Sequence, residues 1–291
     1  MSRLAEAHPP GAEQPATEAP AIAPPQKPRR KPLLAHASGR GLLISGLTVL
    51  AVLIVWAIVT QAGLVKPLFL PKLSAILRAF VDAVEGRIDG APLLEHVGMS
   101  LLRVVSAFLL AAAVGIPVGL AMGLVPWVRA MLDPFIEFYR PLPPLAYLPL
   151  VIIWFGIGET SKILLIFLAC FAPVTLAARA GVLAASADQI NAARSLGASA
   201  RQLVTFVVLP AALPDILVGL RIGMGVGWTT LVAAEMVAAS TGIGQMVLNA
   251  SNFLRTDIVM MGIFVIGTFA MLFEFAMRWL ERRLVPWRGK V

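Results

Sequence analysis

The sequence predicts an all-α membrane protein with six membrane-spanning helices. Composition, the length of the apolar segments and the placement of basic residues lead to this prediction. The chain has 291 residues, of which 58% are hydrophobic and 14% are charged, whereas a soluble globular domain is about half apolar and a quarter charged. The apolar residues gather in segments of about 20 residues, which is the length of helix that crosses a bilayer.

Basic residues flank the apolar part of the chain on both sides. They are Arg29, Arg30, Lys31 and Arg40 before the first apolar segment, and Arg278, Arg282, Arg283, Arg288 and Lys290 after the last. Because Lys and Arg are enriched in cytoplasmic segments, we expect both termini in the cytoplasm, which agrees with an even number of spans. The net charge of +8 then reports topology and not nucleic-acid binding.

Residues 1–40 are dominated by Pro, Ala and Glu. Such a segment buries too little apolar surface to offset its ordering entropy, so we expect a disordered cytoplasmic tail. It lacks a charged start followed at once by an apolar core, so no secretory signal is expected. The expected organisation is this tail, a six-span domain over residues 41–284 and a cytoplasmic tail over residues 285–291.

The six spans are expected at Gly41–Gly63, Val97–Leu124, Pro134–Phe155, Ile163–Val182, Ala211–Val237 and Ile258–Met277. The first, "GLLISGLTVLAVLIVWAIVTQAG", is an uninterrupted apolar run. Between the first two spans, "LSAILRAFVDAVEGRI" has helical apolar spacing with charges on one side, which predicts an amphipathic helix on the outer surface. "PWVRAMLD" is expected to be a tight inner turn before the third span.

The third span is unusual because "YRPLPPLAYLPLVIIWFG" contains four prolines. A proline inside a helix removes a backbone hydrogen bond, which a bilayer tolerates only where protein or a water-lined cavity compensates. We therefore expect this span to be broken and to line a cavity. After the fifth span, an outer loop is expected to include "STGIGQMVLNASNFLRTD".

A polar segment, "DQINAARSLGASARQLVTFVVLP" from Asp188 to Pro210, lies between the fourth and fifth spans. Two capping boxes are expected, in each of which a Ser is followed three residues later by a Gln. The first begins at Ser186, just before the segment, and the second begins at Ser199, within it. Between them, Gly197 suits the left-handed residue that ends a helix. The pattern predicts a helix, a glycine stop and a second helix on the cytoplasmic side.

Three interpretations of this segment are open from local features. It is an ordinary inter-span loop, a helix-turn-helix DNA reader, or a docking helix for a cytoplasmic motor. The DNA reader is disfavoured because the helices are short, lie beside the membrane and carry only two arginines.

"NAARSLGASARQLVTFVVLPAALPDILVGLRIGMGVGW" resembles the signature of ABC importer permeases: Glu-Ala-Ala, three residues, Gly, and later Leu-Pro at the start of a span. The matching positions are Asn191, Ala192, Ala193, Gly197, Leu209 and Pro210. The likeness covers nearly all of residues 41–291, and "FYRPLPPLAYLPLVIIWFGIGETSKILLIFLACFAPV" is similar to the nitrate, sulfonate, taurine and bicarbonate branch, above all to its taurine-transporting members. Asn191 replaces the acidic residue of the motif.

The resemblance implies a type I, binding-protein-dependent ABC importer permease fold in a bacterial inner membrane. The implied partners are an ABC ATPase homodimer, a second copy of this chain, an external substrate-binding protein and membrane lipid. It also implies that the segment at about 186–199 seats in the ATPase, and that closure of the ATPase switches the path from inward-facing to outward-facing. The implied coupling residues are Asn191, Ala192, Ala193, Arg194, Ser195, Leu196, Gly197, Ala198 and Ser199.

Catalytic and cofactor motifs are not apparent in the sequence. No GxxxxGK[ST] loop is present, so we expect ATP and Mg²⁺ to be bound by a partner ATPase and no cofactor by this chain. The single Cys and three His residues are too scattered for a metal site or a catalytic triad. We therefore expect a non-catalytic subunit.

Ionisable residues within spans are costly in a bilayer and are therefore candidates for function. They are Arg103, Glu137, Arg140, Arg221, Glu235 and Glu274. Glu137 and Arg140 are spaced to neutralise each other, and Arg103 and Glu274 are expected at span ends, where they snorkel or pair at the surface. For Glu235, an internal ion pair with an Arg is favoured over ligand contact.

The candidate residues of the translocation path are Arg140, Trp154, Arg221, Trp228 and Glu235. Arg140 and Arg221 are candidates because a sulfonate is anionic, although both tryptophans also suit a membrane interface. Two glycine ladders, at residues 115, 119, 123 and at 219, 223, 227, have GxxxG spacing. They are interpreted as helix packing, with sliding of the fifth span as the alternative.

The sequence thus leads to the permease subunit of an importer for taurine or a related alkanesulfonate. Nitrate, bicarbonate or another small organic ligand is the alternative substrate within the same class. A secondary transporter is a less favoured alternative, since it needs coupling-ion carboxylates at mid-membrane and usually an internal repeat. A membrane-bound enzyme is disfavoured for want of catalytic groups.

Overall fold

The computed structural model describes residues 39–286, and regular secondary structure within that range is entirely helical. The elements are α1 (Gly39–Gln61), α2 (Leu73–Val84), α3 (Leu93–Leu124), α4 (Pro126–Tyr139), α5 (Pro144–Phe155), α6 (Glu159–Leu183), α7 (Ala187–Ser195), α8 (Ala200–Leu203), the π-helical segment η1 (Val204–Val208), α9 (Leu209–Ala238), α10 (Ile243–Asn252) and α11 (Thr256–Leu284). Most of the two expected cytoplasmic tails lies outside the described residues, and the domain boundaries at residues 40 and 284 stay predictions.

The chain divides into two units, residues up to Leu53 and residues from Ile54 onward. In the first unit, the described residues form the N-terminal part of α1, whose apolar side chains are mostly exposed. The second unit contains the rest of α1 and every later helix. The hydrophobic clusters and the polar clusters of the described chain lie in this second unit.

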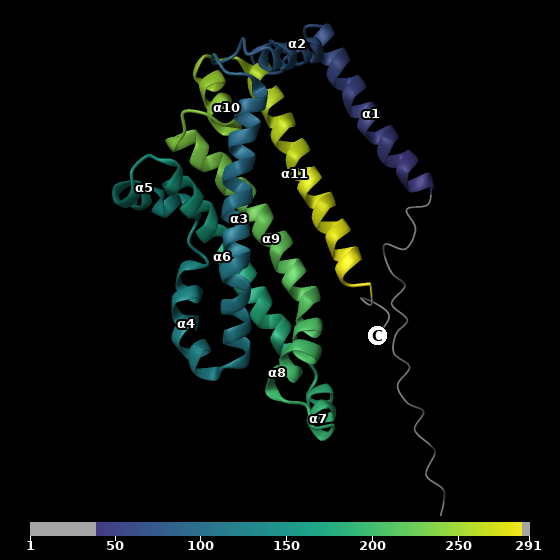
Figure 1. The fold of residues 1–291 in the computed structure, drawn as a ribbon. Coiled ribbons are helices and arrows are strands. Elements are labelled where there is room, and N and C mark those ends of the chain that lie inside the picture. The colour runs from purple at the N-terminus through teal and green to yellow at the C-terminus, as the bar shows by residue number, and fades with distance from the viewer. Residues whose placement is uncertain (1–38, 287–291) are drawn as a thin grey trace, which may run out of the picture. The chain divides into compact units, whose positions relative to one another are not determined.

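Five described helical stretches are long and apolar enough to cross a membrane. They are α1, α3, α6, α11 and the continuous stretch from Ala200 to Ala238 that joins α8, η1 and α9 (Figure 1). These stretches match the first, second, fourth, sixth and fifth expected spans, respectively. The prediction of an all-α membrane-spanning fold is therefore confirmed.

The third expected span differs from the prediction, because neither of the described helices in this region is among the five that are long enough to cross a membrane. It is broken as expected, but into two short helices, α4 and α5, which are separated by residues 140–143. The expected tight turn at residues 126–133 is wrong, because these residues form the first half of α4, with Pro126 in its first turn. Proline is favourable at that position, and Pro144 likewise lies in the first turn of α5. It follows Pro143, which has the extended conformation that is favoured before a proline.

Two short helices pack at the end of the second unit that is opposite α7 and α8 (Figure 1). The amphipathic helix expected between the first two spans is confirmed as α2, which buries Ile76, Ala79 and Ala83. The expected outer loop after α9 is more ordered than predicted, because it contains α10. Met246 of α10 and Met261 of α11 share one hydrophobic cluster with the buried face of α2.

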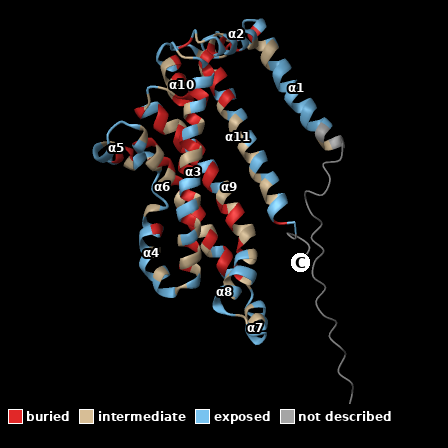
Figure 2. Cartoon of the chain, viewed as in Figure 1, coloured by how far each residue is buried: buried red, intermediate tan, exposed pale blue. Residues whose placement is uncertain are grey.

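Helix α6 packs closely against both α3 and α9, where the buried residues concentrate (Figure 2). A Cβ atom at Gly123 of α3 would lie 2.5 Å from Cβ of Val182 in α6, and one at Gly227 of α9 would lie 2.5 Å from Sγ of Cys170. The other four ladder glycines also face α6 side chains or backbone at close range. Both ladders therefore bring helix backbones together, as predicted.

We expect the variant Gly219→Ala to be less stable than the wild type by about 1–3 kcal/mol, because overpacking forces neighbouring groups to move. The added methyl group would overlap Cβ of Ala177 and lie 3.2 Å from the carbonyl oxygen of Pro173. Gly225→Ala on the same helix is the control, since a Cβ there meets no atom within 4 Å. Thermal unfolding in detergent measures the stability of the two variants. Equal midpoints for Gly219→Ala and Gly225→Ala would contradict close packing at Gly219.

Candidate functional site

The segment between α6 and α9 has the helix ends that the sequence predicts. At the start of α7, Oγ of Ser186 accepts a hydrogen bond from the backbone N–H of Gln189 at 3.2 Å, and Oε1 of Gln189 accepts one from the backbone N–H of Ser186 at 3.3 Å. At the start of α8, Ser199 and Gln202 make the same pair of bonds, at 3.4 and 2.9 Å. Both capping boxes are confirmed, and they satisfy backbone donors that the helices leave free.

Gly197 ends α7 in a left-handed conformation, with a φ of 80°. Its N–H donates to the carbonyl of Arg194 at 2.9 Å, and the N–H of Ala198 donates to the carbonyl of Ala193 at 3.1 Å. These two bonds form a Schellman motif, which satisfies carbonyl groups at the helix end. The α7–α8 turn is therefore held by its own backbone and caps.

The α7–α8 segment has little burial in the described chain. No residue of α7 or α8 is buried, and the side chain of Leu196 at the turn is 88% exposed. Of the nine expected coupling residues, Asn191 to Ser195 lie in α7, Leu196 caps it, Gly197 and Ala198 form the turn, and Ser199 caps α8. Local bonds fix the shape of this segment, so its outward face is free to bind a partner. We call residues 186–199 the handle.

The handle continues directly into α9 through the π-helical segment η1. The N–H of Leu209 bonds to the carbonyl of Val204, five residues earlier, and Pro210 follows, which has no N–H to donate. The π turn thus shifts the hydrogen-bond register where a proline interrupts it. One continuous helical stretch from Ala200 to Ala238 connects the handle to the opposite end of the molecule.

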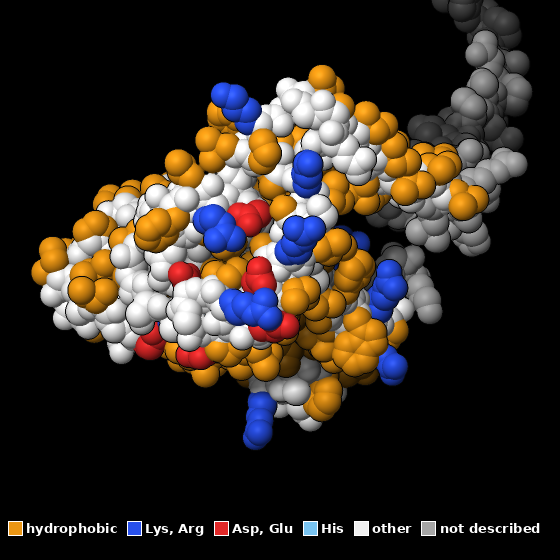
Figure 3. Space-filling view, turned by 90° about the horizontal axis from the view of Figure 1, so that it is seen from above, with side chains coloured by type: hydrophobic (Ala, Val, Ile, Leu, Met, Phe, Trp, Pro, Cys, Tyr) orange, Lys and Arg blue, Asp and Glu red, His pale blue; other side chains and the backbone are white. Residues whose placement is uncertain are grey.

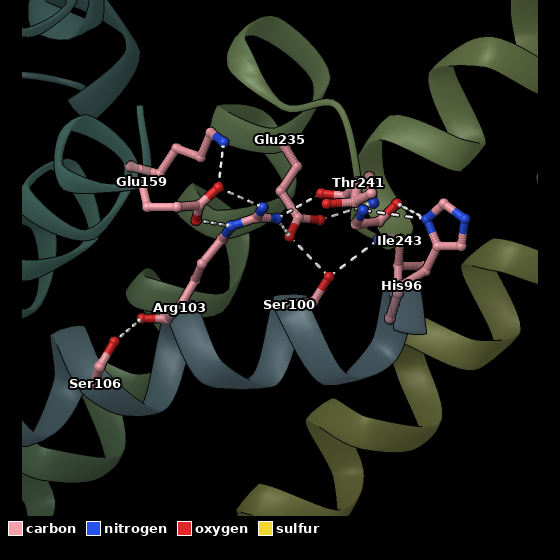
Figure 4. Close-up of polar contacts among 11 residues, drawn as sticks. His96, Ser100, Arg103, Ser106, Glu159, Glu235, Thr241 and Ile243 are labelled. Atoms are coloured by element: carbon pink, nitrogen blue, oxygen red, sulfur yellow. Dashed lines mark hydrogen bonds and ion pairs between the residues drawn. The ribbon is translucent and has the colours of Figure 1, made fainter. Parts of the chain in front are cut away.

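At that opposite end, the buried guanidinium of Arg103 in α3 lies at the centre of an ionic cluster, in which the side chain of Glu159 is 43% exposed (Figure 4). Its Nη1 donates to Oε1 of Glu235 at 2.7 Å, while its Nε and Nη2 contact both carboxylate oxygens of Glu159 at 2.6 and 2.8 Å. The side chain of Arg103 is 0% exposed and that of Glu235 is 1% exposed. The expectation that Arg103 snorkels or pairs at the surface is therefore wrong, and the internal ion pair expected for Glu235 is confirmed.

The carboxylate of Glu235 also holds the N-terminus of α10. Its Oε2 accepts the backbone N–H of Gly244 at 2.9 Å, and its Oε1 accepts the hydroxyl of Ser100 at 2.7 Å. Ser100 in turn accepts the N–H of Ile243 at 3.0 Å. A carboxylate is favourable at a helix N-terminus, so Glu235 joins α9, α3 and α10.

The charges of this cluster balance. Lys162 of α6 donates to Oε1 of Glu159 at 2.8 Å and is itself buried, so two cations face two carboxylates. We call Arg103, Glu159, Lys162 and Glu235 the ionic cluster. Exposed charged side chains also lie on the surface of this end, where basic and acidic groups lie close together among apolar ones (Figure 3). In the ionic cluster, the attraction between opposite charges offsets part of the desolvation cost of burying them.

The five expected path residues occupy different environments. Arg221 pairs with Glu281 and lies 3.7 Å from Glu274, and Trp228 is buried with its ring 5.6 Å from that of Phe273. Both of these candidates therefore lie on the side of α9 that faces α11. The other three lie elsewhere. Trp154 is exposed on α5, Glu235 belongs to the ionic cluster, and Arg140 lines a cavity.

The cavity that Arg140 lines has a volume of about 460 Å³. It lies between α4, α5, α6 and α9, beside the break in the third expected span. The neutralisation expected between Glu137 and Arg140 is wrong, since no ion pair joins them among the described residues. Glu274 instead pairs with the exposed Arg278 at 2.7 Å, which agrees with the surface pairing expected for it.

Sequence reasoning missed the ionic cluster as a unit. Its partners are 56 and 132 residues apart in the chain, and no local pattern links residues at such distances. One signal was available on α3, where His96, Ser100 and Arg103 are spaced to lie on one helical face. A polar stripe on an otherwise apolar span indicates that this face is turned toward protein.

Comparisons with known proteins agree on one family. Residues 115–286 match the family described as "Binding-protein-dependent transport system inner membrane component". The taurine transport system permease protein TauC of Escherichia coli strain K12 is 55% identical over 246 residues, which cover 84% of this chain and 89% of TauC. The putative aliphatic sulfonates transport permease protein SsuC of Bacillus subtilis strain 168 is 36% identical over 84% of this chain and 88% of its own length.

A solved structure supports the fold. An inward-facing conformation of the MetNI methionine ABC transporter contains a chain that matches with a TM-score of 0.54 and 19% sequence identity. The match covers 66% of this chain and 95% of that one. At this identity the likeness concerns the arrangement of the helices alone.

Proposed function

The chain belongs to the family of binding-protein-dependent transport system inner membrane components, and on that premise we propose that it carries taurine or a related alkanesulfonate in an ATP-driven importer. The substrate rests on the 55% identity to TauC over most of both chains. Within the importer, this chain is the non-catalytic, membrane-spanning permease subunit.

The proposed coupling to an ATPase rests on the structure of the handle. None of its residues is buried, its shape is fixed by two capping boxes and a Schellman motif, and it continues into α9. A rigid protrusion joined to a long helix transmits displacement better than a flexible loop does. In this proposal, Asn191 to Ser199 seat in a separate ABC ATPase homodimer, which binds ATP and Mg²⁺.

The remaining partners and the orientation follow from the same assignment. A second copy of this chain completes the path, lipid surrounds it, and a substrate-binding protein docks at the end that carries α2 and α10. The handle and both termini then lie in the cytoplasm of a bacterium, with the spans in its inner membrane. The basic residues in the last turn of α11, Arg282 and Arg283, support this orientation.

The mechanism is a change between two packings of the permease dimer. ATP binding draws the two ATPase subunits together and brings the two handles with them. This movement turns the path outward, so that a loaded binding protein releases its ligand into it, and hydrolysis restores the inward-facing packing. The ATPase thus supplies a difference in affinity between two states.

A secondary transporter is not favoured by the charges of the described spans. Such a protein uses mid-membrane carboxylates to bind its coupling ion. Here Glu235 of α9 is neutralised by Arg103. We therefore do not advance ion-coupled transport as a second function.

The test is the ATPase activity of this chain purified together with the ATPase encoded beside it. We expect taurine-loaded binding protein to stimulate hydrolysis several-fold over the unloaded protein. A stable complex without stimulation would contradict the taurine assignment while keeping the permease role. Failure of the two proteins to associate would contradict the role of the handle.

A further inference from the structure

The cavity beside the broken third span lies at the middle depth of the helical core. Its lining includes Ala172 and Pro173, which are halfway along α6, and Ile222 and Val226, which are halfway along α9. Substrate sites of transporters lie near the bilayer midplane, often where helices are discontinuous. The break between α4 and α5 provides such a discontinuity on the wall of this cavity.

The wall of the cavity is apolar except for a few groups at the break. Arg140 is the one charged residue among its described lining residues, and Tyr139 and Tyr147 are the aromatic ones. The hydroxyl oxygen of Tyr139 is buried and has no hydrogen-bond partner in the described chain. A buried hydroxyl without a partner is costly, so this group is suited to donate to a ligand.

Arg140, which is exposed at the break between α4 and α5, differs from the arginines that lie between the long helices. Arg103, Arg179 and Arg221 are each bound to at least one carboxylate, from Glu235 and Glu159, Asp133, and Glu281, respectively. No ion pair of Arg140 is found among the described residues, although it lies in the expected third span. An arginine without a carboxylate partner within a membrane-spanning region is a candidate contact for an anionic substrate.

We propose that the cavity is the point in the translocation path where the sulfonate group of the substrate binds Arg140, with the hydroxyl of Tyr139 as a second donor. This inference rests on the proposed function and adds the residues that contact the substrate. The cavity volume of about 460 Å³ is ample for a small alkanesulfonate.

The chemistry of the lining suits both ends of an aminoalkanesulfonate. A planar guanidinium presents parallel N–H donors to the oxygens of an oxyanion. The alkyl part contacts the apolar side chains of α6 and α9, and an ammonium group is attracted to the ring faces of tyrosine. A single cation with no second charge beside it binds an anion weakly enough to release it, which conduction requires.

The test is uptake of labelled taurine by the complete complex, which contains this permease, its ATPase and the loaded binding protein, in proteoliposomes. We expect Arg140→Gln to reduce uptake about tenfold or more, while the binding protein still stimulates ATP hydrolysis as in the wild type. Arg140→Lys keeps the charge without the planar donor pair and is expected to retain a larger share of uptake. Arg129→Gln is the matched control, because Arg129 lies in α4, which Arg140 directly follows, and pairs with Asp133 outside the cavity.

A second variant separates substrate contact from structural support. Tyr139→Phe removes only the unpaired hydroxyl, so we expect uptake to fall several-fold with no loss of thermal stability. A fall in stability with unchanged uptake would make the hydroxyl a structural group and would overturn its role as a donor.

The outcomes distinguish this site from the proposed function. Normal uptake and normal stimulation in Arg140→Gln would overturn the site and leave the taurine importer intact. Loss of assembly of the permease dimer in that variant would also overturn it, by making Arg140 an interface residue. A wild-type complex that imports another small anion, with Arg140→Gln again slowing it, would support the site and refute the taurine assignment. A wild-type complex without uptake of any anion would overturn both.

Discussion

Replacing Arg103 with Met is expected to lower the free energy of unfolding by about 3–5 kcal/mol, which is the usual effect of removing one partner from a buried ion pair. Two carboxylates contact this guanidinium, and Glu235 is 1% exposed. The substitution keeps an unbranched side chain of helical propensity, so the loss reports the removed guanidinium, which leaves Glu235 uncompensated and also frees Glu159 and the carbonyl of Thr241. Thermal unfolding of the chain in detergent, followed by tryptophan fluorescence, gives the shift in midpoint.

Two further variants test whether the loss of stability in Arg103→Met comes from the buried charge that is left without a partner. Arg278→Met removes the exposed arginine that pairs with Glu274 on α11, and such surface pairs contribute about 1 kcal/mol or less. The double variant Arg103→Met, Glu235→Met removes both buried charges and is expected to be more stable than Arg103→Met alone. Equal shifts for Arg103→Met and Arg278→Met would show that the ionic cluster is solvated in the protein.

Gly197→Val is expected to uncouple ATP hydrolysis from the loaded binding protein while the chain still inserts into the membrane. The φ of 80° is unfavourable for a β-branched residue by about 1–3 kcal/mol, so the turn that orients α7 against α8 is lost. Since about 1.4 kcal/mol corresponds to a factor of ten, stimulation is expected to fall about tenfold. The measurement is ATPase activity of the purified complex with and without loaded binding protein.

A graded series supports the cause assigned to this effect. A Cβ atom at Gly197 would meet no atom of the described chain within 4 Å, so the penalty expected from the substitution is backbone strain. Asn tolerates left-handed conformations, so Gly197→Asn is expected to keep more stimulation than Gly197→Val. Gly267→Val on α11 is the control, because that glycine has open space and an ordinary φ. Full stimulation in Gly197→Val would contradict the role of the turn.

The parts of the protein that depend on local sequence were predictable. The spans, α2, both capping boxes and the left-handed Gly197 each follow from residues within one or two helical turns of one another. The start of α4 was not predictable in this way. The segment "PWVRAMLD" suggested a turn, but Pro126 permits a helix to begin there. The helix in the outer loop was missed because its N-terminus is held from a distance, by Ser100 and Glu235.

The candidate path was only partly predictable for a related reason. Arg221 and Arg140 look equivalent in the sequence, each a single cation within an apolar span. Tertiary packing separates them, since Arg221 faces Glu281 on α11 whereas Arg140 faces the cavity. The carboxylate that pairs with Arg221 lies 60 positions away in the chain. A single sequence does not show which residues at such a separation come into contact.

The lack of burial in α7 also bears on how such a permease diverges. No side chain of that helix contributes to the hydrophobic core of the described chain, so most of its substitutions leave the stability of the spans unchanged. The caps and Gly197 are the positions that its shape requires. A descendant of this protein can therefore acquire a new ATPase partner through changes in about two helical turns, while the groups that contact the transported molecule stay as they are.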